Sequence, residues 1–127
     1  MNVPDDLRYS SDHEWARLDD EGQVRVGITD FAQDALGPVV FVQLPEPGSS
    51  FEVGATLGEV ESTKSVSEIY APVAGVVVAV NEQLSEKPEL MNEDPYGAGW
   101  LCEIAPEDGD AVKALLDADG YREILPA

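Results

Sequence analysis

The sequence is short of three things: cysteine, basic residues and long apolar runs. A single cysteine, Cys102, excludes a disulfide within the chain. Only 7 Lys and Arg stand against 26 Asp and Glu, which gives a formal net charge of −19. A polyanion is repelled by nucleic acid and by anionic membrane surfaces, so neither is expected as a partner. No apolar run approaches the about 20 residues that a membrane-spanning helix needs.

The N-terminus and the reactive side chains exclude further classes. The opening residues MNVPDDLRYS lack the basic and apolar regions of a secretory signal and the Arg- and Ser-rich character of a transit peptide. A bacterial cytoplasmic location is therefore expected rather than a mitochondrial matrix. The only histidine, His13, and the only cysteine, Cys102, cannot form a metal site together with other His or Cys residues. No nucleophile and base pair stands out either, so we expect neither a metal nor a catalytic site.

What is present indicates one mainly β domain over residues 1–127. Residues 24–28, 39–42 and 76–80 are rich in β-branched side chains and are bounded by turn residues, as in strands. Residues 29–36 predict a short helix, which Asp30 can cap and Gly37 can end.

The C-terminus, over about 107–125, predicts a helical segment that Gly120 interrupts.

A faint internal repeat bears on how the strands are arranged. Residues 37–44 resemble residues 75–82, and residues 57–60 resemble residues 101–104. Two halves of similar strand pattern predict two antiparallel sheets, as a flattened barrel or a sandwich. Lys64 lies between the halves, and we expect it on the turn that joins them.

Around Lys64, residues 58–65 read GEVESTKS, one residue away from the phosphate loop GxxxxGK[ST]. Thr63 stands where the loop needs a glycine, and its Cβ would obstruct the close approach of phosphate. Glu59 and Glu61 would repel a polyphosphate. The residues that follow predict a strand rather than the helix that such a loop must open. A nucleotide site is therefore disfavoured.

Two other interpretations of Lys64 remain. It is an ordinary surface lysine paired loosely with Glu61 or Glu68, or it is an attachment point for a cofactor. The chain has only three lysines, Lys64, Lys87 and Lys113. The tip sequence is also not one that optimises a tight turn. A long amine at the end of a rigid hairpin suits a swinging arm, and acylation would remove its charge.

Four separated segments resemble the H protein of the glycine cleavage system. They are residues 8–15 (RYSSDHEW), 26–37 (VGITDFAQDALG), 58–75 (GEVESTKSVSEIYAPVAG) and 92–100 (NEDPYGAGW), in the family's order and over nearly the whole chain. The resemblance implies a lipoyl/biotinyl-carrier-like fold of two antiparallel sheets.

The resemblance also implies a function. Lys64 would carry lipoate in amide linkage and shuttle the aminomethyl group of glycine from glycine decarboxylase to a tetrahydrofolate-dependent aminomethyltransferase. Dihydrolipoamide dehydrogenase would reoxidise the arm, and a lipoylating enzyme would load it. The chain would be a carrier without turnover of its own, and we expect a monomer. The acidic surface fits docking onto basic faces.

Further site residues follow from the resemblance. Glu61 matches the family pattern for recognition by the lipoylating enzyme. Thr63 and Ser65 replace the family's common Val and Ala at the tip, and they bear on ligase preference. Gly75 matches a glycine of lipoyl domains, expected in a turn that needs a permissive backbone. His13 and Glu14 are expected to line the cleft where the loaded arm rests.

Two alternatives stay open at this point. One is an H-like protein that relays lipoate without serving glycine cleavage. The other is a lipoyl or biotinyl carrier domain of another complex, although the Thr63-Lys64-Ser65 tip differs from the Met-Lys-Met of biotin carriers.

Overall fold

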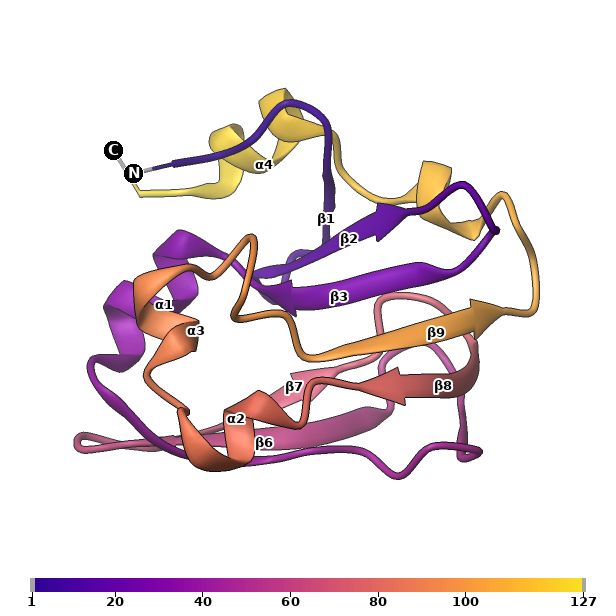
Figure 1. Cartoon of the computed structure of the whole chain (residues 1–127). Coiled ribbons are helices and arrows are strands. Elements are labelled where there is room, and N and C mark those ends of the chain that lie inside the picture. The colour runs from indigo at the N-terminus through magenta and orange to yellow at the C-terminus, as the bar shows by residue number, and fades with distance from the viewer. Residues whose placement is uncertain (1, 127) are drawn as a thin grey trace.

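A computed structural model describes residues 2–126 and places them in two antiparallel sheets with short helices at the edges (Figure 1). The larger sheet has the strand order β1-β2-β3-β9-β8-β5. Its strands are β1 (Arg8–Tyr9), β2 (Glu14–Leu18), β3 (Val24–Ile28), β9 (Cys102–Pro106), β8 (Gly75–Val80) and β5 (Ser50–Phe51).

The smaller sheet has the order β4-β6-β7. Its strands are β4 (Val39–Gln43), β6 (Thr56–Ser62) and β7 (Val66–Tyr70). The two sheets share no paired strands, so the sandwich is confirmed and the closed barrel is not.

The repeat seen in the sequence separates into the two sheets. Its first half supplies β4 and β6, which pair with each other, and its second half supplies β8 and β9, which also pair. The turn that holds Lys64 joins β6 to β7 within the smaller sheet. β7 follows in the same sheet, and the second half of the repeat begins only after residues 71–74, so the expectation that Lys64 lies on the turn that joins the halves is wrong.

The main hydrophobic core lies between the sheets because both contribute β-branched and leucine side chains to it. Val26, Val60, Val77 and Ile104 are fully buried there. Cys102 is buried with them, and burial raises the pKa of its thiol to about 12. Its thiol is therefore protonated and inert near neutral pH, as expected from the apolar run around it.

The predicted helix at 29–36 is present as α1 (Asp30–Leu36). Its N-cap is Thr29 rather than Asp30: the Thr29 hydroxyl accepts the N–H of Ala32 at 3.2 Å. A threonine with extended backbone geometry in this position is a common helix start. Gly37 ends the helix as predicted, and its N–H donates to the carbonyl of Gln33.

Two short helices, α2 (Gln83–Glu86) and α3 (Leu90–Glu93), were not predicted. Each is a single turn, too short to show a helical repeat in the sequence. α3 is held to α1 by Asn92. Its amide donates to Gln33 Oε1 at 3.0 Å and to the carbonyl of Gly37 at 2.9 Å, and its Oδ1 accepts the N–H of Val39 at 2.8 Å.

The C-terminal segment forms a 3-10 turn, η1 (Ala111–Ala114), and a helix, α4 (Ala118–Ile124). Gly120 lies inside α4, so the predicted break there is wrong. The physical reason is that Gly120 occupies the first turn, where its N–H donates to the capping Asp117 carboxylate at 2.8 Å.

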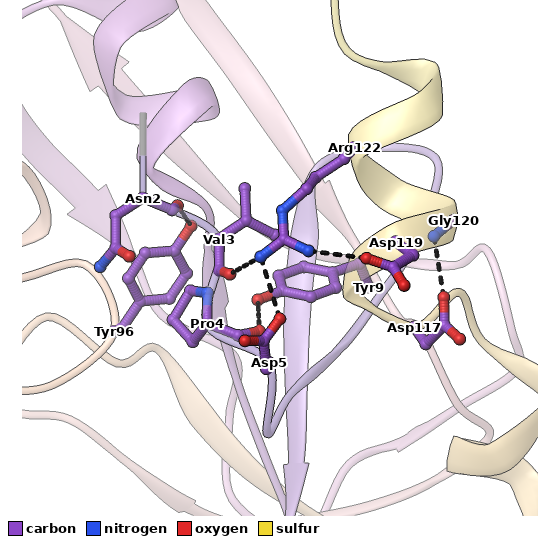
Figure 2. Close-up of polar contacts among 10 residues, drawn as sticks. All are labelled: Asn2, Val3, Pro4, Asp5, Tyr9, Tyr96, Asp117, Asp119, Gly120 and Arg122. Carbon is purple, nitrogen blue, oxygen red and sulfur yellow. Dashed lines mark hydrogen bonds and ion pairs between the residues drawn. The ribbon is translucent and has the colours of Figure 1, made fainter.

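α4 is clasped to the N-terminal segment (Figure 2). The Arg122 guanidinium donates to the carbonyl of Val3 and to Asp5 and Asp119, all within 2.9 Å. The rings of Tyr9 on β1 and Tyr121 on α4 stack at 4.5 Å between centroids. These contacts hold α4 against the larger sheet and fix the position of Tyr121.

Candidate functional site

Lys64 lies at the exposed tip of the β6–β7 hairpin, which projects at the edge of the molecule beside the chain leaving α1 (Figure 1). It forms no ion pair with any of residues 2–126, so the loose pairing with Glu61 or Glu68 is not observed. Its methylene chain crosses Gly37: a Cβ on that glycine would lie 2.7 Å from Lys64 Cε.

The backbone of the tip is held by hydrogen bonds from two directions. The Ser62 hydroxyl accepts the N–H groups of Lys64 at 3.2 Å and Ser65 at 3.1 Å. The Thr63 N–H donates to the carbonyl of Pro38 at 3.1 Å, which ties the tip to the start of β4. Sequence reasoning missed Ser62, although a serine at a turn commonly caps backbone N–H groups.

A groove of about 290 Å³ begins next to Lys64 and runs between α1 and β7. Apolar side chains form much of its walls, among them Phe31 and Ala35 from α1 and Val66 from β7. The groove reaches Asp12 and His13, in the turn that precedes β2. Ser65, the neighbour of Lys64, and His13 therefore line the same hollow.

His13 lines the groove; that the groove is the arm cleft stays a prediction. Its ring is 4.7 Å from the ring of Phe31, and its Nδ1 lies 2.8 Å from the hydroxyl of Tyr121. Burial lowers the pKa of His13, and the nearby Asp12 carboxylate opposes this shift. The lowered pKa favours the neutral imidazole.

Glu14 is buried and does not line this groove; it borders a separate hollow with Tyr9 and Ala71. Its side chain is 1% exposed. One oxygen accepts the Ser10 hydroxyl at 2.7 Å and the other accepts the N–H of Tyr70 on β7 at 2.9 Å. Burial raises the pKa of Glu14 to about 7 despite these two hydrogen bonds, which lower it.

Two other carboxylates, Asp12 and Glu68, do face the groove and a second, more polar hollow beside it. The Tyr70 hydroxyl donates to Glu68 Oε2 at 3.1 Å. Sequence reasoning did not single out Asp12, because no local pattern places it opposite β7.

The three predicted recognition residues near the tip are all exposed: Glu61, Thr63 and Ser65. Glu61 lies in a cross-strand row between Phe41 and Val66, which are 54% and 56% exposed. An acidic side chain flanked by exposed apolar ones therefore marks the outer face of the hairpin.

Gly75 is not at the tip. It begins β8 in the other sheet, opposite Pro106 of β9. The reason for glycine there is close packing rather than a permissive backbone, because an added Cβ would collide with the carbonyl oxygen of Ala105 and lie 2.7 Å from Ile104 Cγ2.

Residues 2–126 offer neither a metal centre nor a membrane-spanning helix. No group of His, Cys, Asp and Glu side chains in that range is arranged to hold a metal ion. None of the helices described has the length and apolar character to span a bilayer.

Comparisons with known proteins agree with this geometry. The model of the family "Glycine cleavage H-protein" matches residues 7–127. The glycine cleavage system H protein of Mycobacterium avium is 56% identical over 128 residues, which cover 98% of this chain and 97% of that protein. The H protein of Mycolicibacterium smegmatis is also 56% identical, over 126 residues, with 97% and 96% coverage.

A crystal structure of the H protein from Mycobacterium marinum superimposes with a TM-score of 0.86 at 46% identity, and covers 95% of this chain and 97% of that one. The two-sheet fold, the exposed hairpin lysine and these matches lead to one conclusion: the chain belongs to the glycine cleavage H-protein family.

Proposed function

We propose that Lys64 is the lipoyl attachment site of this glycine cleavage H protein, within one lipoyl-carrier domain over residues 1–127. Family membership makes the chain the carrier component of a multienzyme system. The observation that carries the assignment to Lys64 is the hairpin tip itself. Its backbone is held by Ser62 and Pro38, while the exposed lysine side chain crosses Gly37 and forms no ion pair among residues 2–126.

The groove fits a lipoyl arm. Its α1 and β7 walls offer Phe31, Ala35 and Val66 to an apolar acyl chain. Amide formation removes the positive charge of Lys64, so the arm can lie along these walls without carrying an unpaired ammonium into them. The charged ammonium of a free lysine does not fit these apolar walls, which supports acylation of Lys64.

When bound, lipoate supplies a redox-active dithiolane that takes up the aminomethyl group of glycine and passes it on. The protein's own contribution is to hold and shield. Asp12 and Glu68 place two carboxylates at the far end of the groove, where a cationic amine is stabilised by them.

We propose that Glu14 acts on the arm indirectly, because its buried oxygens are used by Ser10 and by the Tyr70 N–H. By binding that N–H it holds β7, which is one wall of the groove. If Glu14→Gln left the hydrolytic lifetime of the loaded arm unchanged, Glu14 would have no role in shielding it.

Partner recognition is proposed on the same face. The lipoylating enzyme must reach Lys64 itself, so it must cover the row formed by Phe41, Glu61 and Val66. It must also contact Thr63 and Ser65 at the tip. Gly75 contributes indirectly, by allowing β8 to pack closely on β9. Glycine decarboxylase, the aminomethyltransferase and dihydrolipoamide dehydrogenase need to reach only the end of the arm. A net charge of −19 favours basic docking faces on each. We propose a monomeric carrier without its own turnover, in the bacterial cytoplasm.

The test is a lipoylation assay read by intact mass. The unmodified chain is incubated with a lipoate ligase, ATP and lipoate, beside Lys64→Arg and Lys87→Arg. One lipoyl increment on the wild type and on Lys87→Arg, and none on Lys64→Arg, is the expected result. An increment on Lys64→Arg, or none on the folded wild type, would contradict the assignment.

A further inference from the structure

Three side chains from distant segments form a row of hydrogen bonds that ends at His13 in the groove. The hydroxyls of Thr29 and Tyr121 are 2.7 Å apart, and the Tyr121 hydroxyl is 2.8 Å from Nδ1 of His13. Thr29 and Tyr121 are both 0% exposed, so solvent water does not replace either contact. The chain links the N-cap of α1, helix α4 and the turn before β2.

The direction of these hydrogen bonds is set at Thr29. As the N-cap of α1, its Oγ1 accepts the N–H of Ala32 at 3.2 Å. Its single hydroxyl hydrogen is then available for the oxygen of Tyr121. The Tyr121 hydrogen in turn goes to Nδ1 of His13, which must be an acceptor.

The reverse direction is disfavoured. If Nδ1 of His13 carried a hydrogen, it would donate to Tyr121, and Tyr121 would donate to Thr29. The Thr29 hydroxyl hydrogen would then have no acceptor among the contacts of residues 2–126, inside a fully buried site. An unsatisfied buried donor is costly, so these three hydrogen-bonded side chains favour one arrangement of their hydrogens.

We propose that Tyr121 is a positioning residue that holds His13 as the neutral tautomer with its hydrogen on Nε2, and that this N–H is a fixed donor to the acyl arm. No hydrogen bond from residues 2–126 uses Nε2, and the ring lines the groove. The acceptor is an atom of the acyl arm, at the end of the groove that Asp12 and His13 line. The binding of the arm rests on the proposed function, whereas the tautomer does not.

The backbone at His13 supports a constrained ring. Its φ of 69° is the only positive value at a non-glycine among residues 2–126. The His13 N–H donates to the carbonyl of Ser10, and its own carbonyl accepts the N–H of Thr29 at 3.1 Å. Uncommon backbone conformations persist where surrounding contacts determine them, often at functional sites.

The charged groups around His13 explain why a neutral imidazole suits this groove. Asp12 on its own turn and Glu68 on β7 line the same groove, and α1 contributes the uncharged Phe31. Glu14, the next residue in sequence, is buried and bonded to the Tyr70 N–H. A charged imidazole would pair with these carboxylates and repel a cationic amine. A neutral ring leaves Asp12 and Glu68 available to that amine.

The test uses ring 15N NMR on the unmodified chain, where the only histidine gives the only imidazole signals. The wild type is expected to show the single pattern of an Nε2–H tautomer. Tyr121→Phe keeps the ring that stacks on Tyr9 and should lose this pattern to a mixture, with a rise in the pKa of His13. Tyr70→Phe is the matched control, because its hydroxyl bonds Glu68 instead, and it should keep the pattern.

A second pair of variants changes Thr29, the hydrogen-bond partner of Tyr121. Thr29→Val removes the donor to Tyr121 and should also give a mixture, whereas Thr29→Ser should not. An Nδ1–H tautomer in the wild type, or an unchanged pattern in folded Tyr121→Phe, would overturn the proposal.

The arm is tested separately, on the lipoylated protein. A shift of the Nε2–H resonance on lipoylation, absent in Lys64→Arg treated in the same way, supports the contact. An unmoved resonance on fully lipoylated protein would overturn the arm contact alone. Failure of the chain to be lipoylated would instead contradict the proposed function, and the tautomer result would stand.

Discussion

Lys64 lies across Gly37, the residue that ends α1, so its methylene chain rests on a position that has no side chain. Gly37 has φ 80° and ψ −165°, a conformation open almost only to glycine. A Cβ there would lie 2.7 Å from Lys64 Cε. The end of α1 and the tip of the hairpin are thereby matched to each other.

Gly37→Ala should lower the free energy of unfolding by about 1–3 kcal/mol, because alanine is strained in this backbone conformation. It should also displace the lysine, seen as a changed Cε signal of Lys64 in protein labelled at its three lysines. Gly22→Ala is the control: Gly22 also has a positive φ, of 84°, but no atom lies within 4 Å of the position that an added Cβ would take. The Gly22→Ala variant should also be less stable in urea unfolding, but its Lys64 Cε signal should not change.

Ser62→Ala should loosen the hairpin tip, because the N–H groups of Lys64 and Ser65 lose their shared acceptor. We expect a loss of about 1 kcal/mol in unfolding free energy and faster amide exchange at these two residues. Initial rates of lipoylation should fall with it. Ser65→Ala makes the same chemical change elsewhere in the turn and should preserve both amides; equal exchange in the two variants would show that Ser62 does not hold the tip.

Asn92→Asp should detach α3 from the end of α1. A carboxylate keeps the acceptor for the Val39 N–H, but it cannot donate to Gln33 Oε1 or to the Gly37 carbonyl. Loss of both bonds should cost about 1–3 kcal/mol at pH 7. Urea unfolding at pH 4 should recover part of the loss, because a protonated carboxyl donates once more; no recovery would mean that these donor contacts contribute little.

Glu14→Gln should change how stability depends on pH. The pKa of Glu14 is raised from 4.5 to about 7, so the folded state binds this proton more tightly than the unfolded chain. Its contribution is present in full below about pH 4.5 and is lost as pH rises through about 7, by up to about 3 kcal/mol.

The Gln variant should therefore gain stability relative to wild type as pH rises from about 4.5 to about 7.5, measured by urea unfolding at several pH values. Glu52→Gln, at an exposed position, is the control: its unfolding free energy should change with pH in the same way as that of the wild type over this range. A constant difference between Glu14→Gln and wild type would show that Glu14 titrates alike in both states.

The sequence by itself determined several of the strands, the place of α1 and the candidate lysine, because each depends on neighbours in the chain. The β-branched run at residues 24–28 predicts β3, and Gly37 predicts the end of α1. Lys64 stands out within one contiguous motif that matches the family. The predicted helix break at Gly120 was wrong because Asp117 caps a helix that starts just before this glycine.

Only the tertiary structure decided the groove and what faces it. Its walls come from α1 and β7, and the contact between His13 and Tyr121 spans 108 residues. The burial of Glu14 depends on β7 in the same way, through the Tyr70 N–H. Such contacts leave no periodic mark in the sequence, because they are set by how two sheets and a C-terminal helix pack, and packing brings together side chains that no local pattern relates.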